Sequence, residues 1–520
     1  MTGAVLAAGD SISAPSISYS GLAPVLIILG VALAGVLVEA SLPKAVRFAA
    51  QVGLALAGCV AALIVVIVLA GRAGEVTAAG AIAVDGPALF CQGTLAILGI
   101  FSVLLLAERR LDAAGGAIVA QAALTVGSSN DRMQRTSHDV QTEAFPLFAF
   151  ALGGMMLFPA SNNLLVMFIA LEVLSLPLYL LAGLARHRRL LSQEAAVKYF
   201  LLGAFASAFF VYGLAMLYGY AGTVSLAGIR QSASVSDKGD LLLLLGFALL
   251  VVGMLFKGNV APFHSWTPDV YQGSPSPVTA FMSAATKVAA FGALLRVFYV
   301  AFADSRWDWR PIMWAVAITS MLVGAVFGLT QTDIKRILAY SSIAHAGFLL
   351  VGVISLNVRG ISGTLFYLLT YGIASLGAFA VVSLVRDDDG EATHLSQWAG
   401  LAKRSPMVAA VMTVFLLSMA GIPLTAGFIG KFVIFQAGVD GGLGTLVVIA
   451  LVSSAIAAFS YLRIVVLMYF SDPPEGGPAV SVPSICTQAV VALTAAATIF
   501  LGIIPQPILD VAHRAVPFVS

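Results

Sequence analysis

The sequence predicts an all-α integral membrane protein, and three observations carry this prediction. Of its 520 residues, 60% are apolar and only 10% are Asp, Glu, Lys or Arg, whereas a soluble domain carries roughly 25% charged residues. The mean hydropathy is +1.00. Apolar runs recur along the chain that match the roughly 20 residues a helix needs to cross a bilayer. Because lipid offers no partner to an unpaired backbone amide, these runs are expected to be helices.

The chain begins with three apolar runs and then a long polar segment. The first predicted spans cover residues 21–42, 49–71 and 87–107, and the polar residues 108–143 form a cytoplasmic loop after them. The other predicted spans, of which 144–160 is the shortest, lie at 144–160, 163–183, 194–220, 241–262, 275–300, 311–330, 336–356, 361–385, 405–432, 442–470 and 484–506. This gives about 14 transmembrane helices. The segment RDDDGE at 386–391 is expected to be a solvated turn.

Glycine and proline interrupt two of these spans beside a lysine. Lys257 begins the segment KGNVAP in the seventh span, and Lys431 ends the segment GIPLTAGFIGK in the twelfth. Such interruptions are tolerated inside a membrane only beside protein or a water-filled cavity. In transporters built from repeats, they indicate an ion path when they occupy corresponding positions of the two halves.

The two interrupted spans are five apart, so spans 4–8 and 9–13 are predicted to be two inverted five-helix repeats. The predicted units are residues 1–143 with the first three spans, 144–300 and 301–470 with one repeat each, and 471–520 with the last span.

The charge distribution predicts an orientation and excludes some classes of partner. The chain carries 27 Lys and Arg against 25 Asp and Glu, so bulk electrostatics do not favour nucleic acid. Loops on one side of the predicted spans hold fourteen Lys and Arg, and loops on the other side hold seven. By the positive-inside rule, both termini are expected outside the cytoplasm, on the periplasmic or exterior face of the cell membrane. The three scattered cysteines lack a C-x-x-C spacing, which argues against a metal or iron–sulfur site.

Five ionisable residues lie inside predicted spans, and each is a functional candidate. A charge at the bilayer centre costs at least ~2.5–3.5 kcal/mol, so residues retained there usually act in transport. The five are Glu172, Lys257, Lys287, His345 and Lys431. Glu172 has no charged residue within ten positions on either side, so it must be neutral or paired with a cation on another helix.

Other charged residues in the spans have a simpler explanation. Arg296 and Arg463 are expected to extend from span ends toward the lipid headgroups. Lys198 lies four residues after Glu194 and is expected to form a surface pair with it, so it is a secondary candidate. His345 is explained equally well by packing with a hydrogen bond and by proton transfer.

The five residues together suggest proton translocation without a cofactor. A buried lysine has its charged form disfavoured, and a nearby carboxylate reverses this effect. A pair of Glu172 and Lys257 that opens and closes would therefore raise and lower the proton affinity of the lysine. In a row with Lys287, His345 and Lys431, this pair predicts a gated proton wire.

Three segments resemble a known family. They read FHSWTPDVYQGSPSPVTAFMSAATK at 263–287, TDIKRILAYSSIAHAGF at 332–348 and GIPLTAGFIGKF at 421–432. They are similar to the antiporter-like membrane subunits of proton-pumping NADH:quinone oxidoreductase, respiratory complex I. The TPDVYQG form resembles subunit N, whose mitochondrial counterpart is NADH dehydrogenase subunit 2. The resemblance covers essentially the whole chain, although the 108–143 loop and an N-terminal extension look longer than usual.

The resemblance implies a role for each candidate residue. Glu172 matches the glutamate of span 5, Lys257 the lysine of broken span 7, and Lys287 the central lysine of span 8. His345 matches the histidine of span 10, and Lys431 the lysine of broken span 12. Lys198 corresponds to a secondary lysine of span 6.

The resemblance also implies partners. The chain is expected to work as one subunit of a translocase in the bilayer, beside antiporter-like sister subunits and other membrane and peripheral subunits. NADH, FMN, the iron–sulfur clusters and quinone are expected in those partners. Two alternatives remain open at this point. One is a subunit of a multisubunit cation/proton antiporter or membrane-bound hydrogenase, and the other is a stand-alone ion-coupled solute transporter.

Overall fold

The structure is a computed structural model that describes residues 17–72, 74–112, 115–120, 124, 128–130, 133, 140–235, 240–387 and 390–519. The elements of the N-terminal part are α1 (Tyr19–Ser41), α2 (Lys44–Ala70), β1 (Glu75–Thr77), β2 (Ile82–Val84) and α3 (Gly86–Leu106). Those of the next part are α5 (Ala144–Leu157), α6 (Leu164–Ala182), α7 (Arg189–Ala221), α8 (Leu226–Val235), α9 (Leu241–Lys257), α10 (Trp266–Gly273) and α11 (Ser276–Arg296).

The second half of the chain contains the remaining elements. They are α12 (Arg306–Thr330), α13 (Ile334–Ser355), α14 (Val358–Val382), β3 (Val385–Asp387), β4 (Gly390–Glu391), α15 (Leu401–Arg404), α16 (Pro406–Ala420), α17 (Ala426–Asp440), α18 (Gly444–Phe470), β5 (Ala479–Val480), α19 (Ile485–Ile503) and α20 (Gln506–Arg514). The strands are short and form two small antiparallel sheets in connections, β1–β2 and β4–β3–β5.

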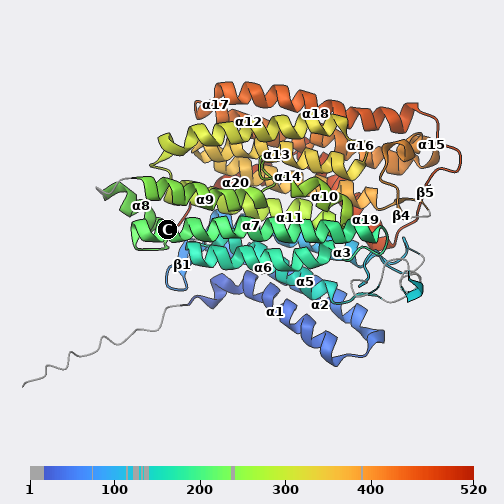
Figure 1. The fold of residues 1–520 in the computed structure, drawn as a ribbon, viewed down its shortest axis with the longest axis horizontal. Helices are drawn as coiled ribbons and strands as arrows, with labels where there is room; N and C mark the ends of the chain where they lie inside the picture. Colours follow the sequence, from blue (N-terminus) through green and yellow to red (C-terminus); the bar gives the residue numbers. More distant parts are fainter. Residues whose placement is uncertain are drawn as a thin grey trace, which may run out of the picture.

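The long helices run nearly parallel to one another and form one bundle (Figure 1). One end of the bundle, here called the β1 end, carries β1, α8 and the C-terminus. The opposite end, here called the β3 end, carries β4, β5 and α15 (Figure 1). Helix α1 also starts at the β1 end, so the described chain begins and finishes at the same end of the bundle.

Helices occupy all fourteen of the apolar runs that the sequence predicts to span the membrane. Within the described residues, eleven helices are long and apolar enough to cross a bilayer. Three shorter apolar helices, Ala144–Ala160, Leu241–Lys257 and Pro406–Ala420, fill the other runs. The protein is therefore an all-helical, multi-span membrane protein, as predicted. Helices α8, α10, α15 and α20 lie outside the apolar runs and were not predicted.

Helices α11, α13 and α14 form the centre of the bundle. Almost every residue of all three is buried, which is the position expected of a helix that is apolar all round. Helices α1, α2, α7 and α18 bury only one face each and leave large apolar side chains exposed. Those exposed faces suit contact with lipid.

Both predicted interruptions are present. Helix α9 ends at Lys257, and Asn259 adopts a positive φ of 62° before α10 starts at Trp266. Helix α16 ends at Ala420, the next residue Gly421 has a φ of 82° in the left-handed region that stops helices, and α17 starts only at Ala426. Each break leaves carbonyls without a helical partner inside the bundle, and side chains take their place: Trp266 Nε1 donates to the Phe256 carbonyl, and Lys431 donates to those of Met419 and Ala420.

The segment 386–391 is not the solvated turn that the sequence predicts. Arg386 of β3 pairs with Glu391 of β4, and β5 adds a third strand. Lys335 is only 2% exposed and donates to Glu391 Oε2 at 2.7 Å, which Ser276 Oγ also approaches at 2.7 Å. A buried amine needs a charged or hydrogen-bonding partner. The hairpin of β3 and β4 provides this partner for Lys335 and covers it. Burial opposes the charge of Glu391, but Lys335 and Ser276 outweigh it and lower the pKa of this carboxyl. Residues 388 and 389 lie outside the described part.

Much of the predicted 108–143 loop also lies outside the described residues, as do residues 1–16 of the N-terminal extension. Arg132, which contributes to the charge bias, is among them. Asp112, at the start of the loop, lies 2.5 Å from His187 and 2.9 Å from Arg386. The described start of the loop is thus held against the β3 end of the bundle.

Candidate functional site

Lys257 is the last residue of α9, and its side chain contacts aromatic residues of α6 and α7. It is 1% exposed, and its Nζ donates to the hydroxyl of Tyr199 at 3.2 Å. The Nζ also lies 5.0 Å from the ring centre of Tyr199 and 5.5 Å from that of Tyr179. Trp266 of α10 stacks on Tyr199 and fixes its ring. One hydroxyl and two aromatic faces stabilise an ammonium only modestly, so this site tolerates both protonation states.

Glu172, in the middle of α6, is half-buried. No ion pair joins it to Lys257 in the described structure, and its buried Oε1 has no hydrogen-bond partner there. Tyr179, seven residues after Glu172 and so on the same face of α6, has its ring centre 5.5 Å from Lys257 Nζ. The face of α6 that carries Glu172 is therefore turned toward the lysine, but the predicted pair is not in contact.

Lys287 lies near the middle of α11, the most buried helix of the bundle. It is 1% exposed, and its Nζ donates to the backbone carbonyl of Ser342 at 2.5 Å and lies 4.9 Å from the ring centre of Tyr371. By the helical rise of 1.5 Å per residue, it stands ~16 Å from Ser276 at the β3 end and ~14 Å from Arg296 at the β1 end. Lys287 is therefore close to mid-membrane.

His345, on α13, stands between the two central tyrosines of α14. Its Nδ1 lies 2.5 Å from the hydroxyl of Tyr367, and its ring centre lies 4.7 Å from that of Tyr371. Its Nε2 has no hydrogen-bond partner among the described residues. A buried imidazole with one free nitrogen is able to accept or release a proton.

Lys431 lies in the second break, and its contacts differ from those of Lys257. Its Nζ donates to the carbonyls of Met419 (2.8 Å) and Ala420 (3.1 Å) and to Ser454 Oγ (2.9 Å), and it lies 5.2 Å from the ring centre of Phe348. Both carbonyls are at the C-terminal end of α16, where the helix dipole favours a cation. Three oxygen acceptors make this site better suited than that of Lys257 to the charged form.

Shared partners connect four of the predicted residues. Tyr199, the partner of Lys257, stacks on Trp266, which packs against Tyr271 with ring centres 6.3 Å apart. Asn259 donates to the hydroxyls of Tyr271 at 2.8 Å and Ser342 at 3.3 Å, and the Ser342 carbonyl accepts from Lys287. Tyr371 contacts both Lys287 and His345. Phe348 then contacts both His345, with ring centres 5.6 Å apart, and Lys431, whose Nζ lies 5.2 Å from its ring centre. The result is one buried row from the first helix break to the second, which we call the central row.

Lys198, the secondary candidate, lies outside the central row. It is paired with Glu194 at 2.6 Å, as predicted, and also with Asp269 of α10 at 2.5 Å. Asp269 in turn pairs with Arg336 of α13 at 2.6 Å. Lys198 therefore belongs to a partly exposed ion network that ties α7 to α10 and α13.

Sequence reasoning missed the tyrosines and small polar residues that connect the charges. The important ones are Tyr199, Asn259, Ser342, Tyr367 and Tyr371. Tyr367 and Tyr371 are four residues apart in an apolar run, which puts two phenols on one helix face. That spacing was a usable signal, whereas a single serine in a membrane helix is too common to be one.

Arg296 does not extend to the headgroups, contrary to the prediction. Its side chain is 0% exposed, and it forms an ion pair at 2.6 Å with Asp85, which is 1% exposed and caps the start of α3. Its Nε also donates to the Pro159 carbonyl at 2.6 Å. The prediction was wrong because Asp85 provides a buried countercharge for Arg296. Asp85 follows β2 and is far from Arg296 in sequence, so this ion pair could not be predicted.

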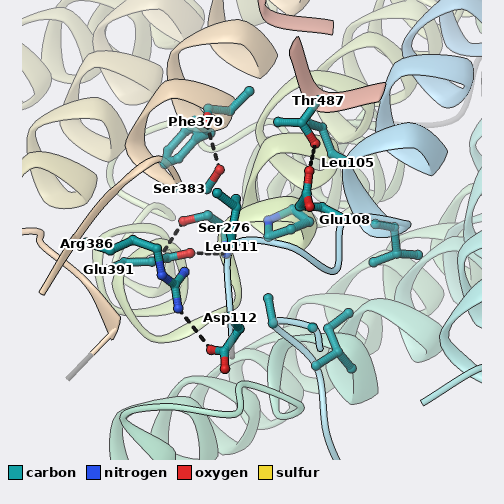
Figure 2. A pocket seen from close by; sticks show the side chains of 16 residues that line it. Leu105, Glu108, Leu111, Asp112, Ser276, Phe379, Ser383, Arg386, Glu391 and Thr487 are labelled. Carbon is teal, nitrogen blue, oxygen red and sulfur yellow. Dashed lines mark hydrogen bonds and ion pairs between the residues drawn. The ribbon is translucent and has the colours of Figure 1, made fainter. Parts of the chain in front are cut away.

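A small pocket with both apolar and charged residues in its lining lies at the β3 end, where α11 begins (Figure 2). Its volume of about 20 Å³ is enough for a water molecule. Glu108 and Glu391 line it with the hydroxyls of Ser276 and Thr487 bonded to them. Burial opposes the charge of Glu108, but hydrogen bonds from Ser484, Thr487 and the Arg110 backbone outweigh it and lower the pKa of this carboxyl.

Polar groups continue from this pocket along α11. Ser276, Ser283 and Lys287 are seven and four residues apart and so share one side of the helix. Ser283 Oγ lies 2.9 Å from Ser375 Oγ of α14. Ser375 is one helical turn from Tyr371, on the side of the β3 end. Ser283 lies ~10 Å along α11 from Ser276 and ~6 Å from Lys287, so these groups mark the side of the helix that runs from the pocket to the central row.

A buried row of exchangeable groups between two broken helices defines a class of protein, the membrane subunits that translocate protons or exchange them for cations. Comparison with known proteins agrees. Residues 161–457 match the family described as "NADH:quinone oxidoreductase/Mrp antiporter, TM". The chain belongs to this family and, within it, to the subunit N group of NADH-quinone oxidoreductases.

Individual relatives support this assignment. The chain is 60% identical to NADH-quinone oxidoreductase subunit N of Parafrankia sp. (strain EAN1pec), over 98% of this chain and 97% of the relative. It is 56% identical to the subunit N of Rhodococcus opacus (strain B4), over 99% and 98%. Among solved structures, a chain of respiratory complex I from Thermus thermophilus with bound aureothin superposes with a TM-score of 0.76 at 34% identity, covering 94% of this chain and 99% of that one. A chain of the Mrp complex from Dietzia sp. DQ12-45-1b shares the fold, with a TM-score of 0.80 at 20% identity over 96% and 97%.

Proposed function

We propose that this chain carries protons across the cell membrane as subunit N of NADH:quinone oxidoreductase, using Glu172, Lys257, Lys287, His345 and Lys431 as its relay. The observation that carries the proposal is the central row, in which shared hydrogen-bond and aromatic partners join three buried lysines and a histidine. Of the alternatives that the sequence left open, high-identity relatives named subunit N favour this one over an antiporter or a lone transporter.

The geometry suggests what each residue does with the proton. Water in the β3-end pocket delivers a proton along Ser283 and Ser375 to Lys287. From Lys287, the proton is transferred through the hydroxyls and the imidazole of the central row to Lys431. The three oxygen acceptors of Lys431 keep this lysine charged until the next proton arrives. Closing of Glu172 onto Lys257 raises the proton affinity of that lysine, and opening lowers it. Electron transfer in the partner subunits drives this change.

We propose a 14-span architecture with two inverted five-helix repeats. Helices α5, α6, α7, the broken pair α9 and α10, and α11 form the first repeat, within residues 144–300. Helices α12, α13, α14, the broken pair α16 and α17, and α18 form the second, within residues 301–470. The breaks fall at the fourth position of each set, which supports the correspondence. Residues 1–143 and 471–520 flank the two repeats.

Both termini are proposed to face the periplasm or cell exterior, because the predicted loops opposite them hold the excess of Lys and Arg. Both ends of the described chain lie at the β1 end of the bundle (Figure 1), which supports their being on the same side of the membrane. A phosphatase fused after Ser520 is expected to be active and a fluorescent reporter that matures only in the cytoplasm is expected to be dark. The same reporters inserted after Asp387 should give the opposite result. Cytoplasmic reporter activity at Ser520 would reverse the orientation.

The redox groups are proposed to reside in partner subunits, which would bind NADH, FMN, iron–sulfur clusters and quinone. Cys59 and Cys91 are buried in α2 and α3, and Cys486 lies in α19; the described residues contain no cluster of His, Cys, Asp and Glu suited to a metal. The purified subunit is therefore expected to show no visible absorption band, with the assembled complex as the positive control. A stoichiometric chromophore in the isolated chain would contradict the proposal.

Glu172 and Lys257 are expected to be coupled. Glu172→Gln and Lys257→Met should each slow proton uptake and NADH-driven quinone reduction in membrane vesicles, and the double variant should lose less than the sum of the two losses. Residues that act on each other show coupling free energies of about 0.5–3 kcal/mol. Glu172→Gln combined with Lys403→Met, an exposed lysine paired with Asp472, is the control and should be additive. Additivity in the Glu172 and Lys257 pair would show that the two do not act together.

A further inference from the structure

A large cleft lies outside the central row, at the β1 end of the bundle. It has a volume of about 770 Å³ and runs between α2, α3, α14 and α20. Its walls are mainly apolar, and they include Leu63 and Ile97 deep in the membrane-spanning part of α2 and α3. Its other end, near the mouth of the bundle, is formed by Gly71, Gly86 and Arg514. The cleft is thus apolar at one end and polar at the other.

The dimensions of the cleft suit an extended hydrocarbon chain. Along α3 it reaches from Gly86 to Ile97, a length of ~16 Å at 1.5 Å per residue. An extended peptide would leave its amides unpaired in an apolar environment. A fatty acyl chain carries no such polar groups.

The polar end of the cleft carries a positive charge without a partner. Arg514, at the end of α20, is exposed, and the described residues offer its guanidinium neither a hydrogen bond nor an ion pair. Arg72, which follows the lining residue Gly71, is exposed in the same way. The carboxylate of Asp85 also lines the cleft, but Arg296 and the backbone N–H of Val519 neutralise it. Arg514 lines the cleft and Arg72 is next in sequence to a lining residue, and a guanidinium beside an apolar channel matches an anionic headgroup with an acyl chain attached.

We propose that this cleft is a binding site for an anionic phospholipid, with one acyl chain between α2 and α3 and the phosphate at Arg514 and Arg72. The glycines of the wall support the assignment. At Gly71 and Gly74, a side chain would meet nothing within 4 Å, so the wall is left open where the headgroup and the start of the acyl chain enter. The amphipathic helix α20 contributes Ile508 and Val511 to the apolar side and Arg514 to the polar side, as an interfacial helix does.

The test uses the assembled complex in nanodiscs with phosphatidylglycerol that carries a photoreactive diazirine in one acyl chain. After irradiation, peptide mapping is expected to find the label on α2 and α3, near Leu63 and Ile97. Phosphatidylcholine with the same acyl chains should label these helices several times less, and inorganic phosphate in excess should not displace the lipid. Equal labelling by the two lipids would overturn the proposal.

Variants distinguish the headgroup site from general lipid contact. Arg514→Gln and Arg72→Gln should each reduce labelling about fivefold, because a basic residue near a membrane surface contributes that much to binding an anionic lipid. Both residues are exposed, so the complex should assemble normally. Arg306→Gln is the control, since Arg306 is an exposed arginine that contacts Trp307 away from the cleft. Unchanged labelling in both arginine variants would overturn the site. So would a photoreactive residue at position 97 that crosslinks to another polypeptide instead of to lipid.

Discussion

Replacing Lys287 with Met is expected to lower proton uptake at least tenfold, and NADH-driven quinone reduction with it, while the complex still assembles. Met matches the length of the lysine stem but cannot carry a proton. The change removes the group that α11 places between the two broken helices, where Nζ contacts both Ser342 and Tyr371. A positioned proton-transfer group contributes typically ~10²-fold or more to turnover, so a loss of at least tenfold is expected. Proton uptake and NADH oxidation in membrane vesicles measure it.

Two further variants show whether the proton itself matters. Lys287→Arg keeps the charge and should also be nearly inactive, because a guanidinium does not release its proton in the accessible pH range. Lys403→Met, at a side chain that is 55% exposed, should have normal activity. Full activity of Lys287→Met in a normally assembled complex would mean that Lys287 is a packing residue.

The second large effect is expected at Asp85 and Arg296. Asp85→Asn keeps the cap on α3 and removes only the charge, which leaves the fully buried guanidinium of Arg296 without a countercharge. Breaking a buried ion pair in this way costs about 3–5 kcal/mol, so little complex should assemble, and what does assemble should have a lower midpoint of thermal unfolding.

The matched controls use a double variant and an exposed ion pair. Asp85→Asn combined with Arg296→Met should recover part of the stability, since no charge is then left alone. Asp440→Asn breaks the exposed pair with Arg359 and should cost no more than about 1 kcal/mol. Equal effects of the buried and exposed variants would contradict the structural role given to Asp85.

The sequence was enough to predict the helices and the charged members of the site, because both depend on local composition. An apolar run can only be a helix in lipid, and a lysine such as Lys287 is conspicuous within one. The breaks beside Lys257 and Lys431 were equally visible as glycine and proline. These features need no knowledge of which helices are neighbours.

The partners of these residues were not predictable, because each comes from a distant part of the chain. Arg296 finds Asp85 across 211 positions, and Lys335 finds Glu391 across 56. From sequence alone, Arg296 looked like a span-end residue and the hairpin of Glu391 like a solvated turn. Only the packing of the helices brings these charges together. Once they are buried, each charge needs its partner, because an unpaired charge inside the protein is costly in free energy.

Helix α11 is fastened at both ends. Ser276 in its first turn is bonded to Glu391, and Arg296 in its last turn is bonded to Asp85 and to the Pro159 carbonyl. A helix held at both ends in this way cannot slide along its axis, because sliding would separate the buried charges of Arg296 and Asp85. Any movement that accompanies proton transfer is therefore expected in side chains, such as the flexible stem of Lys287, and not in a sliding of α11 along its axis.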